Sequence, residues 1–318
     1  MRRSTRLLAL IPALALTLSA CGGDAEHRPA ADGAVAVATT TMLGSVLDDI
    51  TECAGTSSFS VMSPGDDPHT FSLSSDQVAA MVKADLVVAN GLGLEQGISS
   101  ALANVTADGG RVFEVAPTVD PIPFGEHEGH DHDAAEHEGH DHGSEDPHFW
   151  LDVSRMALAA GNIGDELAKA TGDDTYAECG RQVASELEDT HEQVKQILAA
   201  VPEDRRVLVT DHDAFGYFAQ AYGFRVVGVV VPGGSTDAEP SSQDLAAITD
   251  AIRTHNVSAI FSNTAASDKL VKAVAAEAGQ DVRIIPLHVG SVGPKGSDAD
   301  TYAKMMTANA TLIAEALG

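Results

Sequence analysis

The chain has 318 residues, of which 44% are hydrophobic, 21% charged and only 4% aromatic. This length is ample for a buried core and, at roughly 150 residues per domain, predicts about two lobes. Lysine and arginine total 19 against 47 acidic residues, so the formal net charge is −28. A surface this acidic repels phosphate backbones and anionic headgroups, which argues against nucleic acid as a partner and favours cationic ligands.

A signal peptide for export is predicted over residues 1–20. Two arginines open it, and the apolar stretch that follows is too short to span a membrane stably. The stretch ends in Leu18-Ser19-Ala20-Cys21, which resembles the bacterial lipobox, where the cysteine is lipidated and becomes the mature N-terminus. We therefore expect lipid attachment at Cys21, a flexible lipidated tether over residues 21–34, and an extracytoplasmic protein anchored to the bacterial membrane.

Two further cysteines, Cys53 and Cys179, follow Cys21. An exported chain with two remaining cysteines can join them in a disulfide. Two separately buried thiols are the alternative, and the sequence leaves both open.

Strands and helices alternate in the first half of the chain. A strand is predicted from Val35 to Thr40, and a helix follows it with Thr41 as N-cap. Ser74 and Gln77 form the capping-box signature of a second helix. Further strands are predicted around 59–61, at 86–89 and at 111–115, with a helix at 94–105. This alternation predicts a parallel sheet with helices on its faces.

The second half repeats the pattern. Strands are predicted at 206–210, 225–231, 257–262 and 282–289, and helices at 214–222, 243–255, 269–278 and 301–317. Between the halves, Thr175–Ala200 has helical spacing of apolar residues over a length of about 38 Å.

We therefore expect an α/β protein of two lobes, each a mostly parallel sheet flanked by helices, joined by one long rigid helix. The N-terminal lobe is predicted over 35–172, the linking helix over 173–201 and the C-terminal lobe over 202–318. Ligands of open α/β sheets bind at the carboxyl ends of the strands, which in a two-lobed protein face each other across a cleft.

Asp-Pro-His occurs twice, as Asp67-Pro68-His69 and Asp146-Pro147-His148. Proline fixes its own φ and biases the preceding residue towards extended conformations, so the following imidazole is held on a stiff corner. A single histidine here would be read as a turn residue, but the repeated tripeptide favours a pair of metal ligands.

His212 is the third candidate, because it follows a predicted strand and opens a helix. Capping of that helix is its alternative role. Three imidazoles with a fourth position open or filled by oxygen are a zinc arrangement. Neighbouring carboxylates are expected to orient the rings, a role open to Asp67, Asp146, Asp211 and Asp213.

A histidine-rich loop is predicted over residues 126–145, between the two Asp-Pro-His corners. Glu-His-Glu-Gly-His-Asp-His occurs there twice, ten residues apart. No packed core can be built from this composition, so we expect a disordered loop. Its imidazoles are expected to gather metal, with a merely solubilising loop as the alternative; they are His127, His130, His132, His137, His140 and His142.

In these features the chain resembles the cluster A-I substrate-binding proteins, the zinc-binding lipoproteins that feed ABC importers. The shared elements, in order, are the lipobox, Pro-x-x-Asp-Pro-His at 64–69, Ala-Asp-Leu-Val-Val-Ala-Asn-Gly at 84–91, the histidine-rich loop, the segments 146–152 and 212–218, and Glu-Pro-Ser at 239–241. The resemblance implies that His69, His148 and His212 bind the metal between the lobes. Manganese carriers of the family usually have glutamate at the third position, so His212 points to zinc.

The chain departs from the family at Gly290, where many members place an aspartate as the fourth ligand. The site must then use water or another side chain. Glu239 and His288 are the candidates for a fourth metal ligand. His191 and His255, on predicted helices, are expected at the surface.

We therefore expect a high-affinity extracytoplasmic zinc-binding protein that delivers zinc to an ABC permease in the cytoplasmic membrane. It is expected to be a monomer, not an enzyme, and a zinc metallochaperone is a further candidate partner. The alternatives are a carrier of manganese or another divalent metal, a zinc-dependent hydrolase and an extracellular metal buffer. Against a hydrolase, the sequence has no His-Glu-x-x-His and no carboxylate clearly placed as a general base.

Overall fold

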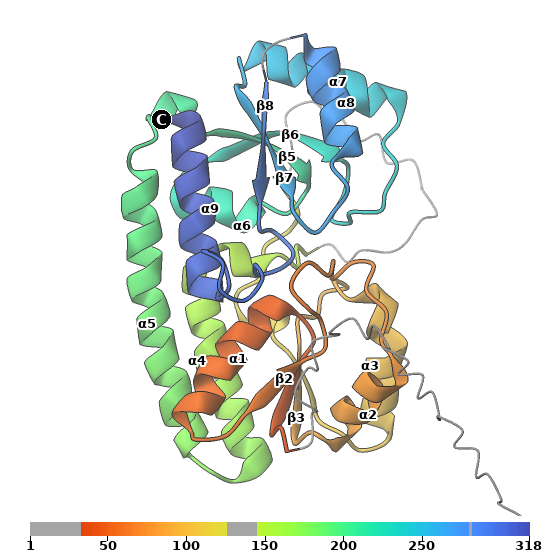
Figure 1. The fold of residues 1–318 in the computed structure, drawn as a ribbon, viewed down its shortest axis with the longest axis vertical. Coiled ribbons are helices and arrows are strands. Elements are labelled where there is room, and N and C mark those ends of the chain that lie inside the picture. The colour runs from red at the N-terminus through yellow and green to blue at the C-terminus, as the bar shows by residue number, and fades with distance from the viewer. Residues whose placement is uncertain (1–32, 126–144, 280–281) are drawn as a thin grey trace, which may run out of the picture. The chain divides into compact units, whose positions relative to one another are not determined.

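Two four-stranded parallel sheets organise the protein, one in each half of the chain (Figure 1). The first has the order β2-β1-β3-β4 and the second the order β6-β5-β7-β8, so the halves share one topology. The strands are β1 (Ala36–Ala38), β2 (Ser58–Ser60), β3 (Leu86–Ala89), β4 (Val112–Glu114), β5 (Val207–His212), β6 (Arg225–Val231), β7 (Ala259–Asn263) and β8 (Arg283–Leu287). The predicted two-lobed α/β fold is confirmed.

This computed structural model describes residues 33–125, 145–279 and 282–318, all of which belong to one compact unit. The predictions for the signal peptide, Cys21, the tether up to residue 32 and the six loop histidines lie outside the described residues. None of the helices in the described ranges is long and apolar enough to cross a membrane.

The sheet of the N-terminal half is covered on both faces. Side chains alternate along a strand, so Val37 and Val87 pack with the helices α2 (Ser75–Lys83) and α3 (Ser99–Ala107). Ala36, Ala38 and Val88 pack on the other face, towards α1 (Thr41–Cys53) and α4 (Val153–Thr171). Burial of both faces explains why these strands are apolar without alternation.

Several helix starts differ from the prediction by one or more residues, and two of them are informative. The N-cap of α1 is Thr40, whose hydroxyl accepts from the backbone N–H of Leu43. Thr41 is already helical, and its Oγ1 instead accepts from the N–H of Val292 at 3.0 Å. The helix predicted at 94–105 begins as a 3-10 turn, Gln96–Ile98, and continues as α3. The capping box of Ser74 and Gln77 is confirmed.

Helix α4 was not predicted. Asp152 caps its start by accepting from the N–H of Ser154 at 3.0 Å, and Gly172 ends it in the left-handed conformation. It lies antiparallel to α5 (Thr175–Leu198), the predicted long helix. The two backbones approach closely because Gly164 and Gly180 face each other; a Cβ on Gly164 would lie 2.8 Å from the Cα of Gly180.

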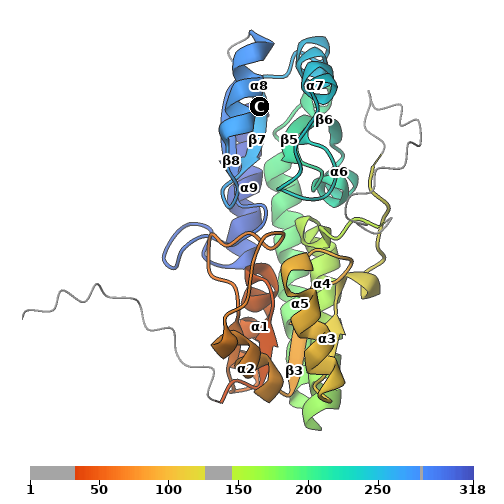
Figure 2. The ribbon, with the colours of Figure 1, turned by 90° about the vertical axis from the view of Figure 1, so that its right-hand side faces the viewer.

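In the C-terminal half, α7 (Ser242–Thr254) and α8 (Lys269–Ala278) cover one face of the sheet. The helices α6 (Gly216–Tyr222) and α9 (Tyr302–Leu317) lie on the other side. Figures 1 and 2 show α5 running along both halves, beside α4 and α9. A disulfide joins Cys53, the last residue of α1, to Cys179 in α5, with Cα atoms 5.8 Å apart.

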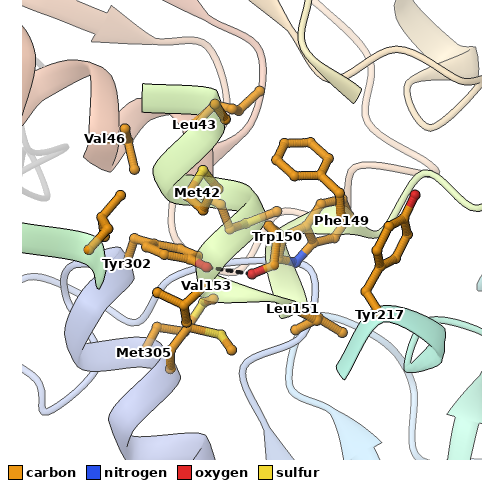
Figure 3. Packing of buried hydrophobic residues seen from close by; sticks show 14 of the residues in the cluster. Met42, Leu43, Val46, Phe149, Trp150, Leu151, Val153, Tyr217, Tyr302 and Met305 are labelled. Carbon is orange, nitrogen blue, oxygen red and sulfur yellow. Dashed lines mark hydrogen bonds between the residues drawn. The ribbon is translucent and has the colours of Figure 1, made fainter. Parts of the chain in front are cut away.

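The largest hydrophobic cluster extends through both halves, and Figure 3 shows the part of it around Trp150. Trp150 lies in the 3-10 turn Phe149–Leu151, and its Nε1 donates to the carbonyl of Val289 at 2.8 Å. The hydroxyl of Tyr302, from α9, donates to the carbonyl of Trp150 at 2.6 Å. Side chains of α1, α6 and α9 surround this turn, so the corner that carries His148 is packed from both lobes.

Candidate metal centre

Three imidazoles from three distant segments meet between the sheets. His69 lies in the turn after β2, His148 precedes the 3-10 turn Phe149–Leu151, and His212 is the last residue of β5. Each offers a ring nitrogen, and these nitrogens all lie within 4.8 Å of one another. His148 and His212 are buried and His69 is partly buried.

The spacing of the rings suits one metal ion. The Nε2 atoms of His69 and His148 are 3.3 Å apart. Donors at about 2.0–2.1 Å from a tetrahedral ion lie roughly 3.3–3.4 Å from each other. The ring centroids are 5.2 to 5.5 Å apart, with no two rings stacked face to face. The arrangement can therefore hold a single ion by imidazole nitrogens.

His148 is held by Asp146. The Oδ1 of Asp146 accepts from the backbone N–H of His148 at 2.9 Å and from its ring Nδ1 at 2.7 Å. A carboxylate only accepts, so Nδ1 carries the proton and Nε2 is left as the ligand atom. Asn90, at the end of β3, supports the same corner by donating from Nδ2 to the carbonyl of Pro147 at 3.0 Å.

His212 lies beside the carboxylate of Asp211, with Nδ1 and Oδ1 3.2 Å apart. The ring and the oxygen do not have hydrogen-bonding geometry there, so this contact is electrostatic. Burial lowers the pKa of His212, but the carboxylate of Asp211 and those of two further aspartates outweigh burial, and the net shift is upward. The surroundings of His212 thus favour positive charge, which a bound cation also supplies.

Asp67 braces the corner of His69 and connects it to the C-terminal half. Its Oδ1 accepts from the backbone N–H of His69 at 3.1 Å, and its Oδ2 accepts from the hydroxyl of Thr236 at 2.5 Å. Burial raises the pKa of Asp67, and these hydrogen bonds partly offset that shift. Of the four aspartates expected to orient rings, only Asp146 is hydrogen-bonded to one, the ring of His148. Asp211 and Asp213 act on the ring of His212 through their charge, and Asp67 holds the backbone of His69.

The fourth-ligand candidates lie outside this group. Within the described ranges, the only cluster of three or more such donors consists of the three histidines. The side chain of Glu239 is exposed. His288 is half-buried, its Nδ1 lies 3.3 Å from the hydroxyl of Thr264, and its backbone is held by Asn309.

Gly290 lies where its neighbours leave little room. A Cβ there would lie 3.1 Å from Cδ of Pro68 and 3.3 Å from Nδ2 of Asn263. Asn263 was not singled out from the sequence; it directly follows the strand predicted at 257–262 and is the last residue of β7. His191 is not simply a surface residue, since its Nδ1 lies 3.3 Å from the hydroxyl of Tyr222.

Comparison with known proteins identifies the family. The family described as the periplasmic component A of the zinc-uptake complex matches residues 36–316. The chain belongs to this family. It is a substrate-binding protein of a metal ABC importer and not an enzyme, so the hydrolase alternative is dropped.

Named relatives cover nearly the whole chain. The zinc-binding protein TroA of Treponema pallidum is 30% identical over 324 residues, covering 98% of each chain. The manganese-binding lipoprotein MntA of Bacillus subtilis is 28% identical over 319 residues, again covering 98% of each. The solved structure of TroA superimposes with a TM-score of 0.77 at 27% identity, over 90% of this chain and 99% of that one. The relatives are thus named for two different metals.

Proposed function

We propose that this chain captures zinc outside the cytoplasm and delivers it to an ABC permease, with His69, His148 and His212 as the protein ligands. The observation that carries the proposal is the donor set: three imidazoles within 4.8 Å of one another and no carboxylate in that cluster of described residues. Imidazole suits zinc, whereas manganese prefers carboxylate, carbonyl and water oxygens. The relative named for zinc, TroA, supports the same choice.

Manganese is the second candidate, and the relatives named for manganese favour it. Four aspartates surround the three rings, and a rearranged carboxylate would give manganese the oxygen ligand that it prefers. In the structure the Asp146 carboxylate holds His148, and that of Asp67 holds the N–H of His69 and the hydroxyl of Thr236. The zinc proposal rests on these carboxylates staying with their present partners.

The remaining predictions concern the location of the protein at the membrane and the source of its zinc. We propose that residues 1–20 are removed, that Cys21 carries lipid, and that the tether to residue 34 holds the lobes outside the membrane. The histidines of the loop 126–145 raise the local zinc concentration near His148 without forming the tight site. The lobes are proposed to span 35–172 and 202–318, with the linking helix at 173–201. The protein is proposed to be a monomer, and delivery of zinc to it by a metallochaperone stays a prediction.

The test is a metal competition on the purified mature chain. Zinc and manganese affinities are measured by calorimetry with a competing chelator, for the wild type and for alanine variants of His69, His148 and His212. We expect one tight zinc site, weak manganese binding, and loss of the tight site in each variant, because removing one of three protein ligands removes much of the binding free energy. His255→Ala, a histidine outside the cluster, is the matched control and keeps wild-type affinity.

Two results would contradict this proposal. Tighter binding of manganese than of zinc would establish the second candidate. Near-wild-type zinc affinity in any one of the three variants would remove that residue from the site. The chain without residues 126–145 provides a further arm: it is expected to bind fewer zinc ions in total and to keep the tight one.

A further inference from the structure

Asn263, the last residue of β7, has a buried side-chain amide. Its oxygen is hydrogen-bonded, and its nitrogen has no acceptor among the described residues. Only 3% of the residue is exposed. Its Oδ1 accepts from the backbone N–H of Ala265 at 2.9 Å and from that of Gly290 at 3.4 Å. These two donors fix which end of the amide is the oxygen. Within the part of the chain that the structure describes, Nδ2 has no hydrogen-bond acceptor.

The segments next to this Nδ2 carry two of the three histidines. Strands β5 and β7 are parallel neighbours that pair at Thr210 and Phe261, so their last residues, His212 and Asn263, lie side by side and face the same way. On the other side, the Nδ2 atom is 3.3 Å from the position a Cβ would take on Gly290, and that position is 3.1 Å from Cδ of Pro68. Asn263 is therefore flanked by the segments that carry His212 and His69.

The Nδ2 of Asn263 favours a metal ligand that can also accept a hydrogen bond. A buried N–H without an acceptor is unfavourable, because it has given up its hydrogen bond to water and gained none. The NH2 group only donates, so it cannot coordinate a metal ion itself. An oxygen bound to the ion satisfies both needs, because one lone pair binds the metal and another accepts from Nδ2. Gly290 supplies no side-chain oxygen for this purpose.

We propose that Asn263 Nδ2 donates to an exchangeable water molecule that is the fourth ligand of the bound metal ion. The inference rests on the proposed function and adds the non-protein ligand and the residue that positions it. Water is favoured over a resident anion because the charge of the ion is already balanced nearby by buried or partly buried carboxylates, namely Asp67, Asp146, Asp211 and Asp213. Three histidines and one solvent ligand leave an open position, as in zinc sites that exchange ligands.

Cobalt(II) in place of zinc tests this proposal, because its visible absorption changes with the ligand set. Azide is titrated into the cobalt-loaded protein, and its displacement of water is expected to shift the absorption of the wild type. In Asn263→Asp, one carboxylate oxygen still accepts from Ala265 and Gly290, but the other replaces the donor with negative charge. We expect azide affinity to fall by roughly 10-fold or more, while cobalt still binds one to one.

Asn309→Asp is the matched control. Asn309 is also a buried asparagine of the C-terminal half, but both ends of its amide bond the backbone of His288. Its variant is expected to keep wild-type azide affinity. An unresponsive wild-type spectrum, equal azide affinity in Asn263→Asp and wild type, or an equal loss in Asn309→Asp would each overturn the water site. Failure to bind cobalt or zinc at all would instead overturn the proposed function.

A measurement on the wild type alone covers the case in which Asn263→Asp does not fold. Water-proton relaxation is recorded with the protein loaded with copper(II), with the zinc-loaded protein as reference. We expect a relaxation enhancement that azide suppresses, since azide displaces the bound water. An enhancement that azide leaves unchanged contradicts an exchangeable fourth ligand.

Discussion

The carboxylate of Asp146 holds Nδ1 of His148 and so leaves Nε2 as the nitrogen that could bind a metal ion. We predict that Asp146→Asn lowers zinc affinity by about 10-fold, the usual effect of changing a residue that orients a ligand. The amide keeps the size of the side chain but removes the charge that favours a proton on Nδ1. Zinc affinity measured against a competing chelator checks this.

The matched control is Asp268→Asn, which removes one negative charge at the start of α8, where Asp268 pairs with Lys272. This variant is expected to bind zinc as the wild type does. Equal losses in the two variants would show that the overall charge matters and that orientation of His148 by Asp146 does not.

The three histidines were predictable one residue at a time, because each carries a local signal. Two stand in the repeated Asp-Pro-His corners, and His212 follows an apolar strand. The position of Asn263 next to His212 and Gly290 has no such signal. It depends on β7 lying next to β5 in the sheet order and on the turn of Gly290 reaching Pro68, which are properties of the folded chain.

At the scale of whole elements, the helices α4 and α5 depend on two glycines for their close approach. We predict that Gly164→Ala lowers the free energy of unfolding by about 1–3 kcal/mol, as overpacking does. The new methyl group would lie 2.6 Å from the carbonyl oxygen of Tyr176, which belongs to backbone and cannot swing away. Chemical denaturation followed by circular dichroism measures the change.

Gly161→Ala, one turn earlier in α4, is the matched control. A Cβ at Gly161 meets no atom within 4 Å. Only the helix propensity then changes, and this variant is expected to gain about 0.5–1 kcal/mol. A gain of stability in Gly164→Ala as well would mean that the two helices have room to separate.

The facing acids of α1 and α5 give the protein a pH-dependent stability. Burial, followed by the neighbouring charges of Asp48, Glu52 and Glu186, raises the pKa of Asp49 from 3.8 to about 6. The folded state therefore retains a proton that the unfolded chain has lost between about pH 4 and pH 6. Over that interval the unfolding free energy falls as the pH rises, and above it the penalty is complete.

We predict that Asp49→Asn raises the free energy of unfolding at pH 7.5 by up to about 1 kcal/mol. Protein atoms surround the carboxyl closely enough to raise its pKa, but the residue keeps solvent-exposed surface, and screening by solvent reduces the gain. The gain should vanish only well below pH 3.8, the ordinary pKa of the carboxyl, where both states of the wild type are protonated. Denaturation midpoints across this range measure it, with Glu315→Gln on α9 as the control. A gain independent of pH would rule out relief of charge repulsion.

The eight strands of the described residues were all predicted near their observed places, since buried parallel strands form short apolar runs. Helix α4 was missed although Asp152 and Gly172 mark its ends. Its interior is rich in alanine and glycine, so the helical spacing of large apolar residues is hard to recognise in the sequence. That face becomes evident only once α4 is packed between the sheet and α5.

At the scale of the molecule, the metal cluster and the joint between the lobes are parts of one structure. The single tryptophan of the chain, Trp150, has its ring 5.2 Å from that of His148. The same residue bonds Val289 and Tyr302 of the C-terminal half. The backbone of Tyr302 in turn donates to Ser45 of α1 at 2.9 Å. Movement of the lobes would therefore disturb the corner that carries His148.

We predict that Tyr302→Phe weakens both the fold and the metal site. The buried carbonyl of Trp150 loses its donor, which costs about 1–3 kcal/mol of unfolding free energy. Because Trp150 packs beside His148, zinc affinity is expected to fall several-fold as well, and tryptophan fluorescence follows both changes. Tyr176→Phe is the matched control: its hydroxyl bonds Thr56 at 3.2 Å within the N-terminal half, away from the cluster. Tyr176→Phe should lose some stability and keep its zinc affinity. A Tyr302→Phe variant that is destabilised but binds zinc normally would show that the packing between the lobes does not affect the three histidines.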